Sequence, residues 1–408
     1  MYVNILEIYL IKNQKKSKIN KMIVTDSQEL KEICQRFATH PFVTVDTEFL
    51  REFTYYSKLC LIQLASPEEA FCIDPLAENM DLTPLFDLMM NERVVKVFHS
   101  ARQDIENFYM LMNKVPAPLF DTQVAAMVCG YGESVGYQQL VLDLLKVQID
   151  KGMRFTNWEK RPLSEAQEQY ALSDVTYLRD VYLILKKKLE DAGRGSWIEE
   201  EMQLLLDEES YNPSDATISK KIKYNVKSEK LKFLYQDLYL WREHRAKRLN
   251  RSKRQILRDE TLQEIVKAHP KTVDELKNLR GIPASFFKNN IADEIVFVIN
   301  KSFEKEKEAF YPIPVEKNTT GARKNLMLML HMLLDVVSVQ EETAAKVIAL
   351  HEELVWFASG DDTVRFMQGW RYDIFGKYAV EVKKGTLFFA YNPATYRVEF
   401  CVKNDLFS

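Results

Sequence analysis

Short apolar runs interleaved with helical periods between residues 42 and 206 are the feature that most constrains how this chain can fold. Helices are expected where apolar residues recur with helical spacing, near 26–38, 101–112, 137–145 and 164–190. The apolar runs are FVTV (42–45), LCLIQLA (59–65), AFCI (70–73) and VVKVF (94–98). The turn-forming SPEE separates the second run from the third, as in a hairpin. The sequence therefore predicts an α/β domain in its first half.

The second half of the chain changes to helical periods separated by polar stretches. Helices are expected at 231–248, 259–268, 272–279 and 290–306, and then at about 326–337 and 340–357. Two alternating runs, 378–392 and 397–402, predict a strand pair near the end of the chain. The predicted division is an N-terminal extension (1–21), an α/β domain (22–210), a linker (211–230), a helical domain (231–306), a second linker (307–325) and a second helical unit (326–408).

The composition excludes several classes of protein. The 408 residues are 46% hydrophobic and 28% charged, and no stretch approaches the roughly 18 apolar residues that cross a bilayer. The five cysteines form no C-x-x-C pair, which argues against a structural zinc site and for a reducing compartment. Residues 1–21 put apolar residues before basic ones, the reverse of a secretory signal. We expect a cytoplasmic protein that does not associate with a membrane.

Two carboxylates follow the first apolar run in VDTEF. Asp46 and Glu48 are two residues apart, and a strand turns alternate side chains to the same face. Hard divalent cations prefer oxygen ligands, and metal-assisted phosphodiester hydrolysis needs several carboxylates that converge on one point. On this pattern alone, a solvated strand end is the preferred explanation of the pair.

Three further residues extend the carboxylate pattern. Asp104 lies in the first turns of a helix directly after VVKVF, where the helix dipole alone would favour an acid. Tyr170 and Asp174 are four residues apart on an expected helix, so they share one face. An acid there can bind a metal while a phenol reaches the attacking water. A helix with a half-buried tyrosine is the plain alternative.

The sequence around these residues resembles ribonuclease D, a 3′→5′ exonuclease of the DEDD superfamily. The matching segments appear in the family's order and spacing over roughly 165 residues. They are VDTEFLREFTYYSKLCLIQLA (45–65), FCIDPL (71–76), FHSARQDIENF (98–108), PLFDTQ (118–123) and RPLSEAQEQYALSDVTYLRDVY (161–182). Tyrosine at position 170 is typical of the tyrosine-bearing subclass.

The resemblance implies a ribonuclease-H-like fold, a mixed sheet with flanking helices, and a set of residue roles. Asp46, Glu48 and Asp174 would hold one divalent ion, with Asp46 bridging to a second. Asp104 would support the second ion through water, and Tyr170 would orient or deprotonate the nucleophilic water. The implied cofactors are two Mg²⁺ or Mn²⁺ ions and no nucleotide. The implied products are nucleoside 5′-monophosphates released from the 3′ end of RNA, with transfer-RNA precursors the first candidates.

The helical half also resembles known domains. LYLWREHRAKRLN and the sequence after it, about 230–305, are similar to the HRDC domain, although NRSKRQ stands where that family often has a proline-glycine pair. The segment 361–385 resembles the tail of a second, degenerate HRDC-like domain. The run 241–258 carries eight Lys or Arg against one Glu, the pattern of a phosphate-contacting surface. The arginines expected to bind RNA are Arg245, Arg248, Arg251 and Arg254.

Other residues have both a functional and a structural interpretation. His99 matches a histidine of the family motif and would contact RNA, or it packs as a hydrogen-bonded residue. Phe49 follows Glu48 and would stack on a terminal base, or it belongs to the core. Asp121 is expected to support the site structurally. Two other functions remain open: a DNA 3′→5′ exonuclease, which uses the same chemistry, and a non-catalytic RNA-binding module, which would be expected to have lost some of the acids.

Overall fold

The first half of the chain folds around a six-stranded mixed sheet. The computed structural model describes residues 23–150, 152–288, 290–313 and 321–403, so the expected extension at 1–21 lies outside the described residues. The strand order is β1-β4-β3-β2-β5-β6. The β2–β3 and β3–β4 pairs are antiparallel and the other three pairs are parallel. The strands are β1 (Ile23–Val24), β2 (Phe42–Leu50), β3 (Lys58–Ala65), β4 (Ala70–Ile73), β5 (Val95–Phe98) and β6 (Leu119–Asp121).

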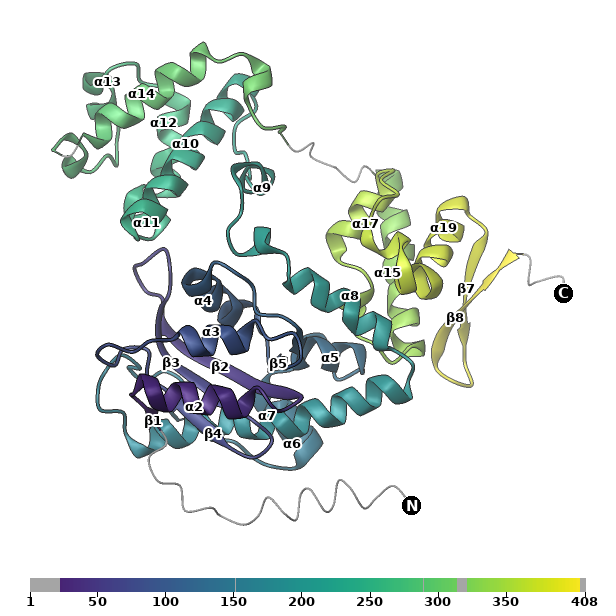
Figure 1. The fold of residues 1–408 in the computed structure, drawn as a ribbon. Coiled ribbons are helices and arrows are strands. Elements are labelled where there is room, and N and C mark those ends of the chain that lie inside the picture. Colours follow the sequence, from purple (N-terminus) through teal and green to yellow (C-terminus); the bar gives the residue numbers. More distant parts are fainter. Residues whose placement is uncertain (1–22, 151, 289, 314–320, 404–408) are drawn as a thin grey trace, which may run out of the picture.

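Helices flank this sheet, as the ribonuclease-H-like expectation requires (Figure 1). The long α7 packs against β2, β3 and β4, while α2 and α3 pack against each other. The helices are α2 (Ser27–Phe37), α3 (Thr83–Met89), α4 (Arg102–Met112), α5 (Thr122–Val128), α6 (Tyr137–Leu145) and α7 (Glu165–Asp191). All four predicted strands and all four predicted helices of this half are present. The prediction of an α/β domain with a mixed sheet is confirmed.

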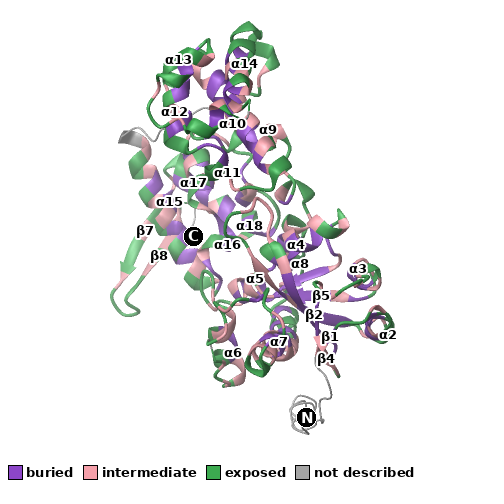
Figure 2. Cartoon of the chain, turned by 90° about the vertical axis from the view of Figure 1, so that its left-hand side faces the viewer, coloured by how far each residue is buried: buried purple, intermediate pink, exposed green. Residues whose placement is uncertain are grey.

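Strand β2 lies between β3 and β5 and carries the first two candidate carboxylates. Val43 and Val45 are fully or almost fully buried, as expected for the apolar run of a central strand. Figure 2 shows β2 coloured mainly as buried. The Thr44 hydroxyl donates to the Val175 carbonyl of α7 at 2.8 Å. This bond fixes β2 against the helix within two residues of Asp46 and one residue of Asp174.

The helical unit that follows has its own core. Leu234, Leu238, Ile265 and Ile295 are fully buried in a cluster separate from that of the sheet. Its helices are α10 (Glu229–Leu249), α11 (Lys253–Ile256), α12 (Asp259–Ala268), α13 (Val273–Lys277) and α14 (Ile291–Glu304). The expected linker at 211–230 contains a short helix, α9 (Asp215–Lys220).

A loop between β2 and β3 touches this helical unit. The Tyr55 hydroxyl donates to the carboxylate of Glu243, a buried residue on α10. The Ser252 amide donates to the Phe53 carbonyl at 2.9 Å, close to the C-terminal end of α10. The strand that carries Asp46 and Glu48 therefore continues directly into the contact with the basic run.

The C-terminal unit is helical and ends in a two-stranded hairpin. It comprises α15 (Gly321–Gln340), α16 (Ala345–Ile348), α17 (His351–Ala358), α18 (Gly369–Arg371), α19 (Lys377–Lys384), β7 (Leu387–Asn392) and β8 (Arg397–Val402). The predicted strand pair is present, but its first strand is shorter than predicted, because residues 377–384 form α19. Ala379 and Val382 are buried three residues apart, a helical spacing that the alternating pattern of the sequence concealed.

This C-terminal unit shares one continuous core with the sheet domain. Trp197, on α8 (Gly195–Leu205), stacks on Trp370 with ring centroids 4.0 Å apart. Arg194 donates to the Val128 carbonyl at 2.8 Å and to the Thr343 hydroxyl at 2.9 Å. The two parts would expose apolar surface if separated, so the experiments below use the full chain. No helix in the described part of the chain is long and apolar enough to span a bilayer.

Candidate active site

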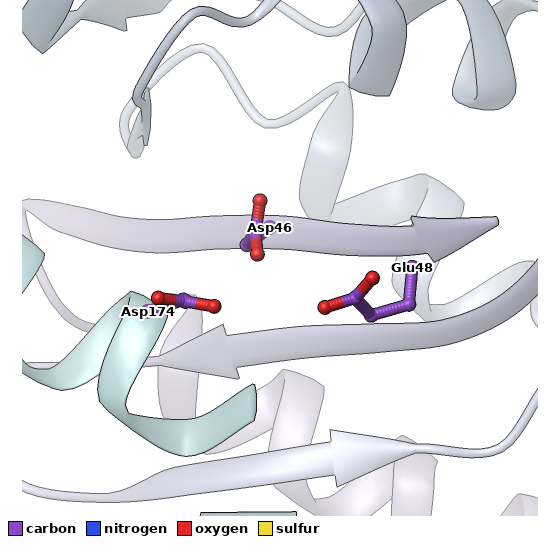
Figure 3. Close-up of side chains that lie close together, drawn as sticks. All are labelled: Asp46, Glu48 and Asp174. Carbon is purple, nitrogen blue, oxygen red and sulfur yellow. The ribbon is translucent and has the colours of Figure 1, made fainter. Parts of the chain in front are cut away.

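Three carboxylates from two elements meet at the edge of the sheet. Asp46 and Glu48 come from β2 and Asp174 from α7, and one oxygen of each lies within 4.8 Å of the others. Figure 3 shows the carboxyl groups of Glu48 and Asp174 directed toward each other below Asp46. Alternation along β2 brings the first two together, and the packing of α7 supplies the third. The sequence-predicted trio is thus assembled in space.

Asp104 lies beside this cluster rather than in it. Its carboxylate accepts a hydrogen bond from the Thr47 hydroxyl, and the Asn107 side-chain amide donates to the same hydroxyl at 3.1 Å. Asp104 is buried on α4, and the negative charge of Asp46 adds to the effect of burial in raising its pKa. Asp46 therefore lies close enough to Asp104 to affect it electrostatically.

The pKa values of these carboxyl groups are raised, which indicates a surplus of negative charge at the cluster. Burial raises the pKa of Asp46 to about 6. Burial, reinforced by Asp46, Asp174 and Asp104, raises the pKa of Glu48 to about 10. The pKa of Asp174 is also raised, first by burial and then by Asp46. Like charges held together out of water favour protons or a cation, and three carboxylate oxygens are the hard ligands that Mg²⁺ or Mn²⁺ prefer.

Tyr170 lies one turn before Asp174 on α7, and its phenol is hydrogen-bonded to that carboxylate. Its ring lies 6.1 Å from that of the buried Trp158. Burial, followed by the charges of Asp174, Glu48 and Asp46, raises the pKa of the phenol. The phenol therefore stays protonated at neutral pH, which suits a group that orients water better than one that removes its proton.

A cavity of about 600 Å³ opens over these groups. Asp46, Asp174 and Tyr170 line it together with His99 and Arg154. Burial lowers the pKa of His99, whose Nδ1 lies 3.0 Å from the Thr122 hydroxyl, so the ring is neutral. Phe49 is half-buried and does not line this cavity.

Asp121 shapes the backbone next to the cavity. Its carboxylate accepts hydrogen bonds from the amides of Ser100, Ala101 and Gln123 at 2.8 to 2.9 Å. These bonds cap the start of α5 and hold the turn that leads into α4, which carries Asp104. The contacts agree with the structural role expected for Asp121.

The four arginines expected to bind RNA fall into two groups. Arg245 has only 11% of its side chain exposed and pairs with Glu294 at 2.5 Å. Arg248 is mostly exposed and lies 4.0 Å from the same carboxylate. Arg251 and Arg254 are exposed beyond the end of α10. Arg248, Arg251 and Arg254 are thus exposed to solvent, whereas Arg245 is held within its own domain by Glu294.

Sequence reasoning missed two residues of the site. Arg154 lies in a polar loop with no periodicity, where nothing in the pattern distinguishes it from a solvated arginine. Thr47 stands between the two acids of VDTEF, and its bond to Asp104 depends on the packing of α4 against β2. Only the tertiary structure brings these groups to the carboxylates.

The raised pKa of Glu48 has a consequence for stability. Because its pKa rises from the ordinary 4.5 to about 10 on folding, the folded state loses stability as the pH rises through that interval. At alkaline pH without metal, Glu48→Gln should therefore raise the unfolding temperature by about 2–4 °C, and added Mg²⁺ should stabilise the variant less than the wild type.

Thermal unfolding in EDTA and in Mg²⁺ measures both effects. Glu199→Gln, a change at an exposed glutamate of α8, is the matched control and should leave both values unaltered. An unfolding temperature for Glu48→Gln below that of the wild type at alkaline pH would contradict the proposed charge repulsion.

Comparisons with known proteins agree with this geometry. Residues 22–190 match the family model described as a 3′-5′ exonuclease, and residues 232–299 match the HRDC domain. The ribonuclease D of Bartonella henselae is 39% identical over 93% of this chain and 95% of its own length. That of Nitrobacter hamburgensis is 40% identical over 90% of this chain and 96% of its own length.

A solved structure supports the same fold. The crystal structure of Escherichia coli RNase D, described as an exoribonuclease involved in structured RNA processing, aligns with a TM-score of 0.78 at 24% identity. It covers 90% of this chain and 99% of the other. One HRDC match is found, and the second HRDC-like domain stays a prediction. The chain has a DEDD-type acidic site, a 3′-5′ exonuclease domain and relatives that match nearly its whole length. It therefore belongs to the ribonuclease D family of 3′→5′ exoribonucleases.

Proposed function

We propose that this exoribonuclease trims structured RNA such as transfer-RNA precursors, using two Mg²⁺ or Mn²⁺ ions and releasing nucleoside 5′-monophosphates one at a time. The observation that supports it best is the convergence of the Asp46, Glu48 and Asp174 carboxylates within 4.8 Å, at a cavity that Tyr170 also lines. The proposed location is the cytoplasm, where five free cysteines remain reduced.

The proposed roles follow from the contacts of each residue. Asp46, Glu48 and Asp174 would hold one cation, and Asp104 would support a second. Bound divalent ions supply Lewis acidity and make a water acidic enough to attack phosphorus near neutral pH. Tyr170, protonated and hydrogen-bonded to Asp174, orients that water. His99, neutral at the cavity wall, contacts the terminal nucleotide.

The two rival functions are less well supported. A non-catalytic RNA-binding module has no use for four buried or half-buried acids, in which the charge of Asp46 raises the pKa of the other three. A DNA exonuclease would use the same acids. RNA is favoured by membership of the family and by the HRDC domain.

Matched RNA and DNA oligonucleotides test this function. Each is offered with a free or a blocked 3′ end, in Mg²⁺, in Mn²⁺ and in EDTA. We expect degradation of the RNA with a free 3′ end in either metal, and none in EDTA. Faster degradation of DNA than of RNA would favour the rival nuclease, and failure to degrade either polymer in both metals would favour the binding module.

The exposed arginines beyond α10 are proposed to hold long RNA. Replacing both Arg251 and Arg254 by alanine should weaken binding of a folded transfer-RNA precursor and reduce the log–log salt slope by about 2, because each phosphate contact contributes about one released ion. Cleavage of a short single strand should be unchanged. Filter binding at several salt concentrations measures the slope.

The control uses two exposed lysines elsewhere in the same helical unit, Lys277→Ala with Lys288→Ala. This control changes the net charge equally and should preserve the slope. An identical slope for wild type and the arginine variant would show that this surface does not hold RNA.

A further inference from the structure

Arg154 lies on the loop between α6 and α7 and is the one lysine or arginine among the described residues that line the active-site cavity. It shares the cavity wall with Asp46, Asp174 and Tyr170. Its positive charge opposes the raised pKa of Glu48, Asp174 and Tyr170.

The loop is anchored so that Arg154 stays at the cavity. Trp158 is buried beside Tyr170, and Arg161 donates to both oxygens of Asp74 at 2.6 and 2.7 Å. The Gln167 amide, in the first turn of α7, donates to the Thr156 hydroxyl at 3.1 Å. These contacts fix the residues after Arg154 to the sheet and to the helix that carries Asp174.

The guanidinium itself is available for a ligand. Within the described ranges, no carboxylate lies within ion-pair distance of it, in contrast to Arg161 and Arg245. It lies over the ring of Phe155, 5.3 Å from the centroid, and Phe155 is 92% exposed. An arginine that has no ion-pair partner among the described residues, and that lines the cavity where the phosphodiester would bind, is placed to donate hydrogen bonds to phosphate.

The charge balance of the proposed reaction calls for such a group. Four carboxylates neutralise two divalent ions, so nothing in that set offsets the charge of the phosphodiester or the further charge that develops during attack. We propose that Arg154 is a catalytic residue that donates hydrogen bonds to a non-bridging oxygen of the scissile phosphate and stabilises the transition state. This inference rests on the proposed function of the same site.

The test compares Arg154→Ala and Arg154→Lys with Lys160→Ala in the full chain. Lys160 is exposed on the same loop and does not line the cavity. On a short single-stranded RNA, Arg154→Ala should lower kcat by about 10²-fold with a much smaller change in KM, as expected when a donor to the transition state is lost. Arg154→Lys should recover part of the loss, and added guanidinium ions should partly rescue Arg154→Ala. Lys160→Ala should match the wild type.

Binding of Mn²⁺ alone, measured by calorimetry, provides a readout independent of turnover. Arg154→Ala removes the positively charged guanidinium from beside Glu48 and Asp174. The variant should therefore bind Mn²⁺ more tightly than the wild type does, although it degrades RNA more slowly. A variant with a disrupted loop would instead show both weaker Mn²⁺ binding and slower RNA turnover.

Two results would overturn the inference. One is a kcat for Arg154→Ala that lies within about twofold of the kcat of an active wild type. The other is weaker Mn²⁺ binding together with no rescue by guanidinium. A wild type that degrades no RNA would contradict the proposed function itself, and is thereby distinguished from failure of the Arg154 role.

Discussion

Asp46→Asn should lower turnover on RNA by about 10³-fold or more while the protein stays folded. Asp46 belongs to the carboxylate trio, and its charge also raises the pKa of Asp104, so it is the acid shared by both proposed ion sites. Asparagine keeps the volume and removes the charge, so the packing of β2 is preserved. Single-turnover rates in saturating Mg²⁺ measure the loss.

The control for Asp46→Asn is Asp191→Asn. Asp191 lies exposed at the C-terminal end of α7 and forms a surface ion pair with Lys187. This variant should retain wild-type rates. Near-normal turnover in Asp46→Asn, with Mn²⁺ affinity unchanged in calorimetry, would show that the carboxylate trio does not hold the catalytic metal.

Tyr170→Phe should lower turnover by about 10²-fold, because the ring keeps its packing against Trp158 while the attacking water loses an orienting hydroxyl. Since the phenol pKa is raised, Tyr170 stays protonated over the working pH range. The pH–rate profile of the variant should therefore be lower than that of the wild type but have the same shape.

Tyr182→Phe, on the same helix and packed against Phe42 and Phe120, is the matched control and should have no effect on turnover. Two results would count against the role proposed for Tyr170. A change of less than about twofold would exclude a catalytic contribution, and loss of one limb of the pH profile would show that the phenol acts as a base.

The trio of acids could be predicted because its geometry is mostly local. Alternation along β2 places Asp46 and Glu48 on one face, and helical spacing places Tyr170 next to Asp174. Joining the two pairs required the family resemblance, since no local rule brings α7 to β2. In the structure that step depends on contacts such as the bond from Thr44 to Val175.

The features that sequence reasoning missed are those set by tertiary packing. Arg154 reaches the cavity because Trp158 and Arg161 anchor its loop, which no periodicity reveals. Arg245 looks like its neighbours in a basic run, but Glu294 on α14 pairs with it. The strand expected across residues 378–384 is helical because Ala379 and Val382 face a core that the sheet domain shares.

The C-terminal unit and the HRDC domain each contact the sheet domain at a different place. The C-terminal unit packs on α5 and α8 through Trp370 and Thr343, while the HRDC domain touches the loop after β2 through Glu243. Both contacts reach elements that carry or support the acids. The accessory parts therefore contact elements of the domain that contains the cavity.

The most direct test of the central claim is the order in which nucleotides leave an RNA labelled at its 5′ end and digested in Mg²⁺. We expect a ladder that shortens by single nucleotides from the 3′ end, with nucleoside 5′-monophosphates identified by mass spectrometry and no products in EDTA or with Asp46→Asn. Release of the 5′ label as the first mononucleotide, or digestion that persists in EDTA, would contradict a metal-dependent 3′→5′ exoribonuclease.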